Sequence, residues 1–211
     1  PAGLSCAFYL AEKGYKPTVF EKNEKAGGML VYGIPSFKLE KDVVEAEIDV
    51  IHKMGVDIKT GVEVGKDITI DELKKQGYKA FYIAIGCQGS RKAGIPGEDA
   101  DGVVSAVDFL KQAGYTHEYP LEGDVVVTGI VLKRCISVKD ADGRFNPQYD
   151  ENDLKTINCR HVFLSIGQST IWGELLKGTK VEVDGVRVKA DKLTYQTTDP
   201  DIFIGGDVYT G

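Results

Sequence analysis

Gly3 and Glu21 have the residue types and the spacing of a nucleotide-binding element. Gly3 begins a helical pattern, which ends at Gly14 and whose apolar positions are Leu4, Ala7, Phe8 and Ala11. A short apolar strand, residues 17–20, then leads directly into Glu21. In a dinucleotide-binding βαβ unit, a glycine-rich turn opens the helix, and an acidic residue about 20 positions later accepts hydrogen bonds from the ribose hydroxyls. This order therefore indicates the second half of such a unit, with its first strand and two earlier glycines expected before Pro1.

The chemistry of this half-unit rests on the start of the helix. Unpaired N–H groups and the positive end of the helix dipole bind pyrophosphate there, and a glycine allows the helix to lie close to the strand. Alone, the pattern is weak, because a glycine at a helix start and a glutamate after a strand are more often a turn and a solvated charge. Further segments must support the interpretation.

Composition bounds the class of protein. A chain of 211 residues suits one large α/β domain or two small ones, and a net charge of -6 argues against nucleic-acid binding, which needs a basic face. No apolar run approaches the ~18 residues of a membrane span, and no secretory leader is seen, so we expect a cytoplasmic protein without a membrane partner. The four cysteines form no CxxC pair, which excludes a thioredoxin-like motif and makes a local metal site unexpected.

Two segments after Glu21 carry more information. Residues 25–38 have no regular period and suggest a surface loop, but they include Met29, Leu30, Val31, Tyr32, Ile34 and Phe37. So much apolar area predicts that a flat apolar ligand covers the segment. Residues 41–54 then predict a core helix with one apolar face, formed by Val43, Val44, Val50, Ile51 and Met54.

These motifs together resemble a known family. Glu21-Lys22, then Gly27-Gly28-Met29, then the run from Tyr32 to Leu39 resembles the FAD-binding domain of the glutamate synthase small (beta) subunit. Relatives in that family include the flavin part of dihydropyrimidine dehydrogenase and the NADH-dependent ferredoxin:NADP oxidoreductases. The resemblance continues in a strand predicted over 80–85, taken as buried on both faces and ending at Gly86, and in a last strand, 201–204, that runs into Gly205-Gly206-Asp207.

The resemblance implies a set of cofactor-binding residues. Those expected along the pyrophosphate and ribose are Pro1, Ala2, Gly3, Glu21 and Lys22. Those expected on the flavin side are Gly28, Met29, Ile34, Pro35 and Lys38, where lysine stands in place of the family's usual arginine and loses bidentate hydrogen bonding. The backbone of Val64 would contact the adenine, Gly86 would form a turn, and Gly206 and Asp207 would close the site, with the following helix expected beyond Gly211. We name no catalytic acid or base and no metal ligand.

The middle of the chain departs from the family. Residues 124–129 look like the opening strand of an NAD(P)H domain, but no GxGxxG follows, and Thr128-Gly129 suggests a two-residue hairpin into a second strand. We therefore expect a discontinuous FAD-binding domain, residues 1–123 and 131–211. The NAD(P)H domain expected between them is absent at a junction of about residues 124–130, and an antiparallel β-meander remains.

The predicted fold is α/β, a Rossmann-like FAD/NAD(P)-binding fold with a parallel sheet plus an antiparallel β-meander. The resemblance implies the FAD-binding core of an NAD(P)H-dependent electron-transfer oxidoreductase. Hydride would pass from NAD(P)H to FAD and electrons onward to iron–sulfur centres, with a large catalytic subunit or iron–sulfur domain as partner. We expect this chain alone not to turn over NAD(P)H, and FAD could be lost from it. The alternative is a non-catalytic Rossmann-type scaffold with weak or no nucleotide binding. The sequence leaves open the family member, NADH versus NADPH, the final electron acceptor and the oligomeric state.

Overall fold

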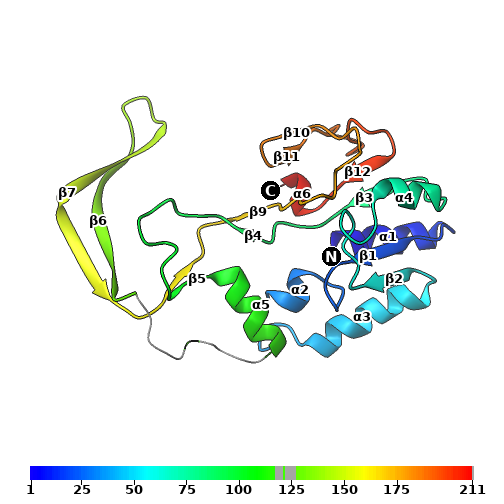
Figure 1. Cartoon of the computed structure of the whole chain (residues 1–211), viewed down its shortest axis with the longest axis horizontal. Coiled ribbons are helices and arrows are strands. Elements are labelled where there is room, and N and C mark those ends of the chain that lie inside the picture. The colour runs from blue at the N-terminus through cyan, green and yellow to red at the C-terminus, as the bar shows by residue number, and fades with distance from the viewer. Residues whose placement is uncertain (117–120, 122–126, 211) are drawn as a thin grey trace. The chain divides into compact units, whose positions relative to one another are not determined.

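The structure, a computed structural model, describes residues 1–116, 121 and 127–210 (Figure 1). These residues form two compact units. The first comprises residues 1–91, 110–116 and 167–210 of the described chain, and the second comprises residues 92–109, 121 and 127–166. The helix α5, Ala106–Thr116, begins in the second unit and ends in the first.

The first unit is mixed α/β. Its elements up to residue 91 are α1 (Ala2–Glu12), β1 (Thr18–Glu21), α2 (Met29–Tyr32), α3 (Lys41–Lys53), β2 (Asp57–Thr60), α4 (Ile70–Lys75), β3 (Phe81–Ile83) and β4 (Gly89–Ser90). Those after residue 166 are β9 (Gln168–Ser169), β10 (Val183–Asp184), β11 (Arg187–Val188), β12 (Ile202–Ile204) and α6 (Asp207–Thr210). The elements expected from the sequence around residues 18–21, 41–53, 81–83 and 202–204 are thus confirmed.

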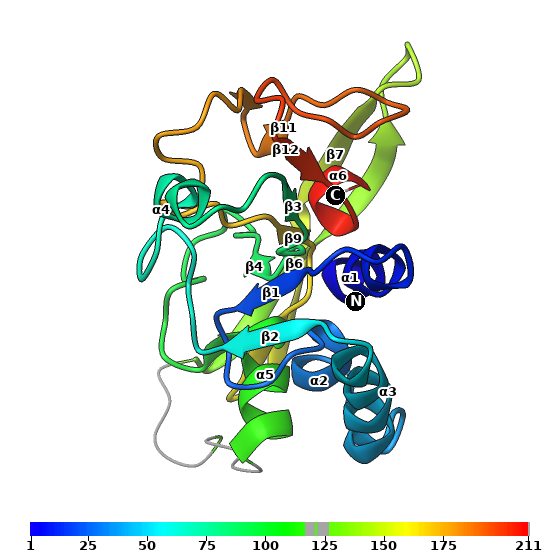
Figure 2. The ribbon, with the colours of Figure 1, turned by 90° about the vertical axis from the view of Figure 1, so that its right-hand side faces the viewer.

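Parallel strand pairs form the framework of this unit. β1 lies beside β2 with Glu21 opposite Thr60 (Figure 2), and β3 lies beside β12 with Phe81 opposite Ile202. Residues buried between β3, β12 and the neighbouring elements form the main core: Ile70, Ile83, Val188, Ile202, Ile204 and Val208. Because Glu21, Gly86 and Gly206 lie at or just after the ends of β1, β3 and β12, the strands bring distant segments of sequence to their carboxyl ends.

The buried face of α3 differs from the one expected. Val44 is buried, but Val43 is 49%, Val50 52% and Met54 38% exposed. A smaller core explains the difference, because Val44 packs with Val31 and Tyr32, and this contact covers only a narrow side of the helix. The expectation of a core helix with all five residues on its buried face was wrong.

The glycine-rich loop also holds more structure than its sequence suggested. α2 lies within it, and its residues Val31 and Tyr32 are buried against α3, so protein rather than a ligand covers that part of the apolar surface. Phe37, in contrast, is 83% exposed. In β3 the expectation of a strand buried on both faces was wrong, since Ile83 is buried but the Tyr82 side is open.

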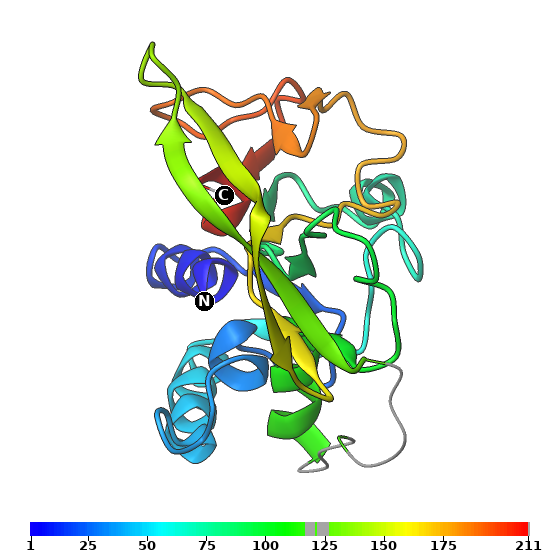
Figure 3. The same cartoon turned by 90° about the vertical axis from the view of Figure 1, so that its left-hand side faces the viewer.

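The second unit is dominated by one long ribbon (Figure 3). Its strands are β5 (Val103–Ser105), β6 (Gly129–Lys139), β7 (Phe145–Asn158) and β8 (Val162–Leu164). β6 and β7 pair antiparallel from Gly129 opposite Asn158 onward, whereas β5 and β8 pair parallel. The expected antiparallel part is therefore a two-stranded ribbon with bulges. Residues 124–126, expected to precede Gly129 as a strand, lie outside the described residues.

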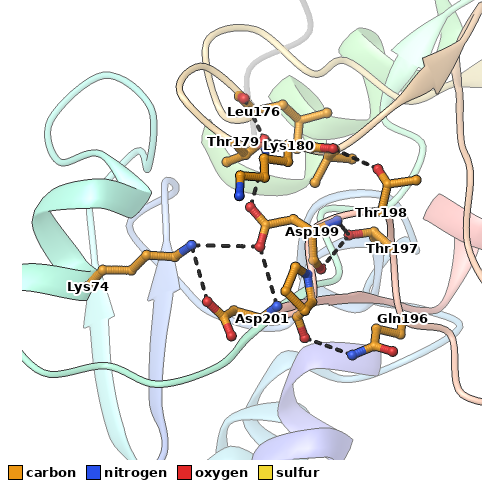
Figure 4. A network of polar contacts seen from close by, with 11 residues as sticks. Lys74, Leu176, Thr179, Lys180, Gln196, Thr197, Thr198, Asp199 and Asp201 are labelled. Carbon is orange, nitrogen blue, oxygen red and sulfur yellow. Dashed lines mark hydrogen bonds and ion pairs between the residues drawn. The ribbon is translucent and has the colours of Figure 1, made fainter.

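A polar network centred on Asp199 ties the end of the first unit to α4 (Figure 4). The buried Asp199 carboxylate accepts hydrogen bonds from the backbone N–H groups of Lys180 (3.2 Å) and Asp201 (3.3 Å). The Lys74 ammonium lies 3.7 Å from Asp199 and 3.4 Å from Asp201. This network holds the segment that leads into β12 and the glycines after it.

Replacing Asp199 by asparagine is expected to lower the free energy of unfolding at neutral pH by about 1–3 kcal/mol, the range for a buried charged hydrogen bond. Burial acts to raise the pKa of Asp199, but the amides of Lys180 and Asp201 and the charge of Lys74 outweigh it and hold the pKa below its ordinary value. A carboxyl with a lowered folded pKa stabilises the fold above its unfolded pKa and loses that contribution as the pH falls through the folded pKa.

The difference in the free energy of unfolding between the wild type and Asp199→Asn should therefore become smaller below about pH 4, the ordinary pKa of an aspartate. Urea unfolding at neutral and acid pH measures it, with the exposed Glu47→Gln in α3 as the control. A difference that is constant with pH would contradict the role of the carboxylate.

No helix among the residues that the structure describes is both long enough and apolar enough to cross a membrane. Within the same residues, no group of three or more His, Cys, Asp or Glu side chains could hold a metal ion.

Candidate nucleotide-binding site

The site is built around the first turn of α1. This helix is 11 residues long, and no side chain caps its N-terminus at Pro1. The first backbone N–H groups of an α-helix have no partner within the helix, and they carry the positive end of its dipole. The start of α1 therefore has unpaired donors of the kind that bind an anionic group. Its role toward pyrophosphate stays a prediction.

Two glycines bring other segments close to this turn. A Cβ at Gly28 would lie 3.4 Å from Pro1 Cδ and 3.9 Å from Gln88 Nε2. A Cβ at Gly206 would lie only 2.8 Å from Ala2 Cβ, and the φ of Gly206 is +69°, a left-handed conformation that favours glycine. The backbone therefore approaches α1 from the α2 loop and from the turn after β12 in a way that a side chain at Gly206 would obstruct.

Carboxylates from two strand ends lie around the same turn. The side chains of Glu21 and Asp207 lie within electrostatic range of the Pro1 nitrogen. Asp207 is the first residue of α6, so the expected helix after Gly206 does begin within the chain. The buried Cys87 thiol donates to the Asp207 carbonyl (3.2 Å) and lies 3.2 Å from Thr170 Oγ1, which fixes the position of that first residue.

Glu21 is held from one side. Its Oε1 accepts hydrogen bonds from the backbone N–H (2.8 Å) and the side-chain Nδ2 (2.7 Å) of Asn23. The backbone carbonyls of Glu21 and Asn23 accept from the amides of Val62 and Gly61, each at 3.0 Å, which anchors the strand end to the segment after β2. Within the described chain, Oε2 receives no hydrogen bond, so one oxygen of the carboxylate is left to accept from a ligand.

The loop that carries Gly28 is held by Lys41. The Lys41 ammonium donates to the carbonyls of Leu30 (2.8 Å) and Ile34, on either side of the end of α2, and burial lowers its pKa. Near the start of the loop, the Lys25 amide donates to the Tyr32 hydroxyl (2.9 Å). These bonds hold the backbone of residues 27–34 in place although three glycines, Gly27, Gly28 and Gly33, loosen it.

Replacing Lys41 by methionine is expected to lower the free energy of unfolding by about 1–3 kcal/mol, because two half-buried carbonyls lose a charged donor. We expect FAD affinity to fall at the same time, since the loop carries Gly28. Urea unfolding and flavin titration measure the two effects. Lys53→Met on the same helix, whose ammonium pairs only with the exposed Asp49 among the described residues, is the matched control. Equal behaviour of the two variants would show that Lys41 does not hold the loop.

The remaining predicted residues lie as follows. A Cβ at Gly3 would meet Ala84 Cβ at 3.6 Å, an ordinary contact, so α1 lies near the end of β3 without requiring glycine there. The Met29 side chain covers Gly33, and the Pro35 carbonyl accepts from the Lys38 amide (2.9 Å).

The other predicted residues are exposed or contact only their own segments and the main core. Lys22 is exposed after β1, and the Lys38 ammonium is 6.0 Å from the centre of the Phe37 ring. Val64 forms an isolated bridge with Ile68 and packs on the main core, whereas Gly86 has a φ of +69° with open space around it.

The structure thus brings Pro1, Ala2, Gly28 and Gly206 into close approach, with Glu21 and Asp207 in electrostatic range of Pro1. Among the described residues, no such approach joins Lys22, Lys38 or Val64 to this turn. The roles of all these residues toward a cofactor stay predictions. Sequence reasoning missed Gln88, Asn23 and Lys41. Only Asn23 gave a signal, as an amide side chain two positions after Glu21, since the other two reach the site from distant segments.

The sequence of this chain is similar to those of known oxidoreductases. Residues 1–131 match the family described as pyridine nucleotide-disulphide oxidoreductase. The chain is 44% identical over 128 residues to the NADP(+)-dependent formate dehydrogenase subunit beta of Moorella thermoacetica, a match covering 60% of this chain and 18% of that protein. It is 46% identical over 113 residues to the glutamate synthase [NADPH] small chain of Bacillus subtilis, covering 54% and 23%. These relatives confirm the resemblance drawn from the sequence, although the matched region is only about a fifth of their length.

Solved structures agree with the expected fold. Mycobacterium tuberculosis FprA in complex with NADPH superposes with a TM-score of 0.76 at 13% identity, covering 99% of this chain and 76% of that one. The thioredoxin reductase of T. acidophilum superposes with a TM-score of 0.60 at 17% identity, covering 100% and 88%. At these identities the likeness concerns the fold alone, and it confirms the Rossmann-like α/β class.

Proposed function

Since the chain belongs to the pyridine nucleotide-disulphide oxidoreductase family, we propose that it is the FAD-binding core of an NAD(P)H-dependent electron-transfer oxidoreductase of the glutamate synthase small-subunit type. One observation carries the proposal. The uncapped start of α1 meets Gly28 and Gly206 so closely that a side chain at Gly206 would contact Ala2 at 2.8 Å, and the Glu21 carboxylate is fixed nearby. An anion-binding turn beside a ribose acceptor is what a dinucleotide needs.

Different residues would bind different parts of the dinucleotide. The first turn of α1 would hold the pyrophosphate, and Glu21 Oε2 would accept from the adenosine ribose. Gly206 lets the turn after β12 lie against Ala2 at the start of α1, and the start of α6 at Asp207 would face the ribityl chain. Lys41 keeps the α2 loop in place beside them. When bound, FAD supplies the redox chemistry, taking up hydride and releasing electrons singly. The protein contributes binding and orientation, so we assign no acid or base.

The proposal extends to parts beyond this site. We propose a discontinuous FAD-binding domain, residues 1–123 and 131–211, from which the intervening NAD(P)H domain is absent at about residues 124–130. The chain alone would then not turn over NAD(P)H. The names of the relatives, a subunit beta and a small chain, support a larger partner subunit. We propose, from the resemblance alone, that this catalytic subunit or an iron–sulfur domain is the electron acceptor.

A flavin-release measurement tests the proposal against the alternative of a non-catalytic scaffold. The purified chain is incubated with excess FAD, freed of unbound flavin by gel filtration and denatured, and the released flavin is quantified. We expect FAD close to equimolar with protein, and a yellow sample before denaturation. Protein that retains no flavin after this treatment would favour the scaffold and contradict a FAD-binding core.

A further inference from the structure

Lys111 connects α5 to the ribose-binding acid through one intermediate side chain. The Lys111 ammonium donates to Asn23 Oδ1 (2.9 Å), and Asn23 Nδ2 donates to Glu21 Oε1 (2.7 Å). All three residues belong to the first unit, and all three are half-buried. Both hydrogen bonds can form at once, because the Asn23 amide oxygen accepts from Lys111 while its nitrogen donates to Glu21.

Neighbouring groups also hold Asn23 and Lys111 in position. The backbone of Asn23 is held at its carbonyl by the Gly61 amide (3.0 Å), and its own N–H donates to Glu21 Oε1. The Lys111 ammonium also lies 5.4 Å from the centre of the Tyr32 ring, within the range of a cation–π contact. Lys111 therefore contacts both ends of the loop that runs from the strand end at Glu21 to α2.

We propose that Lys111 and Asn23 are positioning residues that set the rotamer of Glu21 for ribose binding, an inference that rests on the proposed function. Both Asn23 donors reach Oε1, so Oε2 is the oxygen that remains to accept from the ribose hydroxyls. A charged donor on the amide oxygen polarises the amide and strengthens its donation to the carboxylate. Without Lys111, the Asn23 amide can rotate, and Glu21 loses the bond that selects its orientation.

A double-mutant cycle on FAD affinity tests this coupling in the whole chain. Lys111→Met is expected to raise the Kd for FAD about 5- to 10-fold, the size of one lost hydrogen bond of about 1 kcal/mol. Lys111→Arg keeps a cationic donor and is expected to retain most of the affinity. In the Glu21→Gln background, adding Lys111→Met should change the Kd little, because the residue that it positions is already altered.

A second measurement needs no flavin. In the protein without FAD, the side-chain amide signals of Asn23 in ¹H–¹⁵N spectra should shift in Lys111→Met and again in Glu21→Gln. They should not shift in Lys53→Met, whose ammonium pairs with Asp49 on α3. A merely structural role of Lys111 in holding α5 would lower the thermal midpoint without producing this pattern, and Lys111→Arg would not restore it.

The outcomes separate the two proposals. If wild-type protein binds FAD and Lys111→Met binds it equally well, or if the effects of the two substitutions add fully, the positioning role is overturned and the FAD-binding core stands. If wild-type protein binds no FAD, both are overturned, whatever the spectra show.

Discussion

Gly206→Ala is expected to raise the Kd for FAD about 5- to 150-fold, corresponding to the 1–3 kcal/mol of an overpacked contact. The new methyl group would lie 2.8 Å from Ala2 Cβ, between α1 and the turn after β12. Either the turn moves away from α1 or the methyl group fills the space beside the pyrophosphate turn. Titration of the protein with FAD, followed by flavin fluorescence, measures the change.

Gly185→Ala is the matched control, because it carries the same backbone strain without the contact. Gly185 has a φ of +61°, close to the +69° of Gly206, but a Cβ there would meet nothing within 4 Å. Both variants should lose about 1 kcal/mol of stability from left-handed strain. Only Gly206→Ala should lose flavin. Equal FAD affinities in the two variants would show that the close approach at Gly206 is not part of the site.

Glu21→Gln is expected to raise the Kd for FAD by about 10- to 100-fold, because hydrogen bonds to a charged acceptor contribute about 1.5–3 kcal/mol. The amide that replaces the carboxylate has one acceptor oxygen, and the Asn23 donors at 2.7 and 2.8 Å compete for it with the ribose. Glu24→Gln, an exposed carboxylate in the same loop, provides the control and should bind FAD as the wild type does.

Folding must be separated from binding in this experiment. Circular dichroism should show that Glu21→Gln is folded without flavin. Urea unfolding should show that its free energy of unfolding falls by less than its free energy of FAD binding, because the Glu21 side chain is only half-buried. Unchanged FAD affinity in Glu21→Gln would remove the ribose-binding role from this residue and with it the positioning role of Lys111.

The sequence predicted those parts of the fold in which local pattern and tertiary contact agree. The strand that ends at Glu21 and the strand before Gly205 are short apolar runs bounded by turn residues, and both form as expected. The helix α3 also forms, but its apolar residues outnumber the positions that its neighbours cover, so Val43 and Val50 are exposed. Periodicity shows which residues could be buried, whereas the packing partner decides how many are.

Other parts depend on contacts that a local pattern cannot contain. α2 begins directly after Gly28 in a segment whose glycines indicate a loop, and its burial depends on Val44 from the next helix. The strand β7 consists largely of polar residues, and it pairs with β6 in a register that shifts between Lys133 and Arg134. In the site, Gly28 and Gly206 were predicted from motif resemblance, but Lys111 reaches Asn23 from 88 positions away along the chain.

The most direct test of the proposed FAD site is a calorimetric comparison of FAD with FMN. FMN carries the flavin and one phosphate but has neither the pyrophosphate nor the adenosine ribose, so it cannot use the α1 turn and Glu21 together. We expect FAD to bind with near-equimolar stoichiometry and FMN to bind at least ~10-fold more weakly, since at least one charged hydrogen bond is lost. Equal affinities for FAD and FMN, or no binding of FAD, would contradict a dinucleotide site built on α1, Glu21 and Gly206.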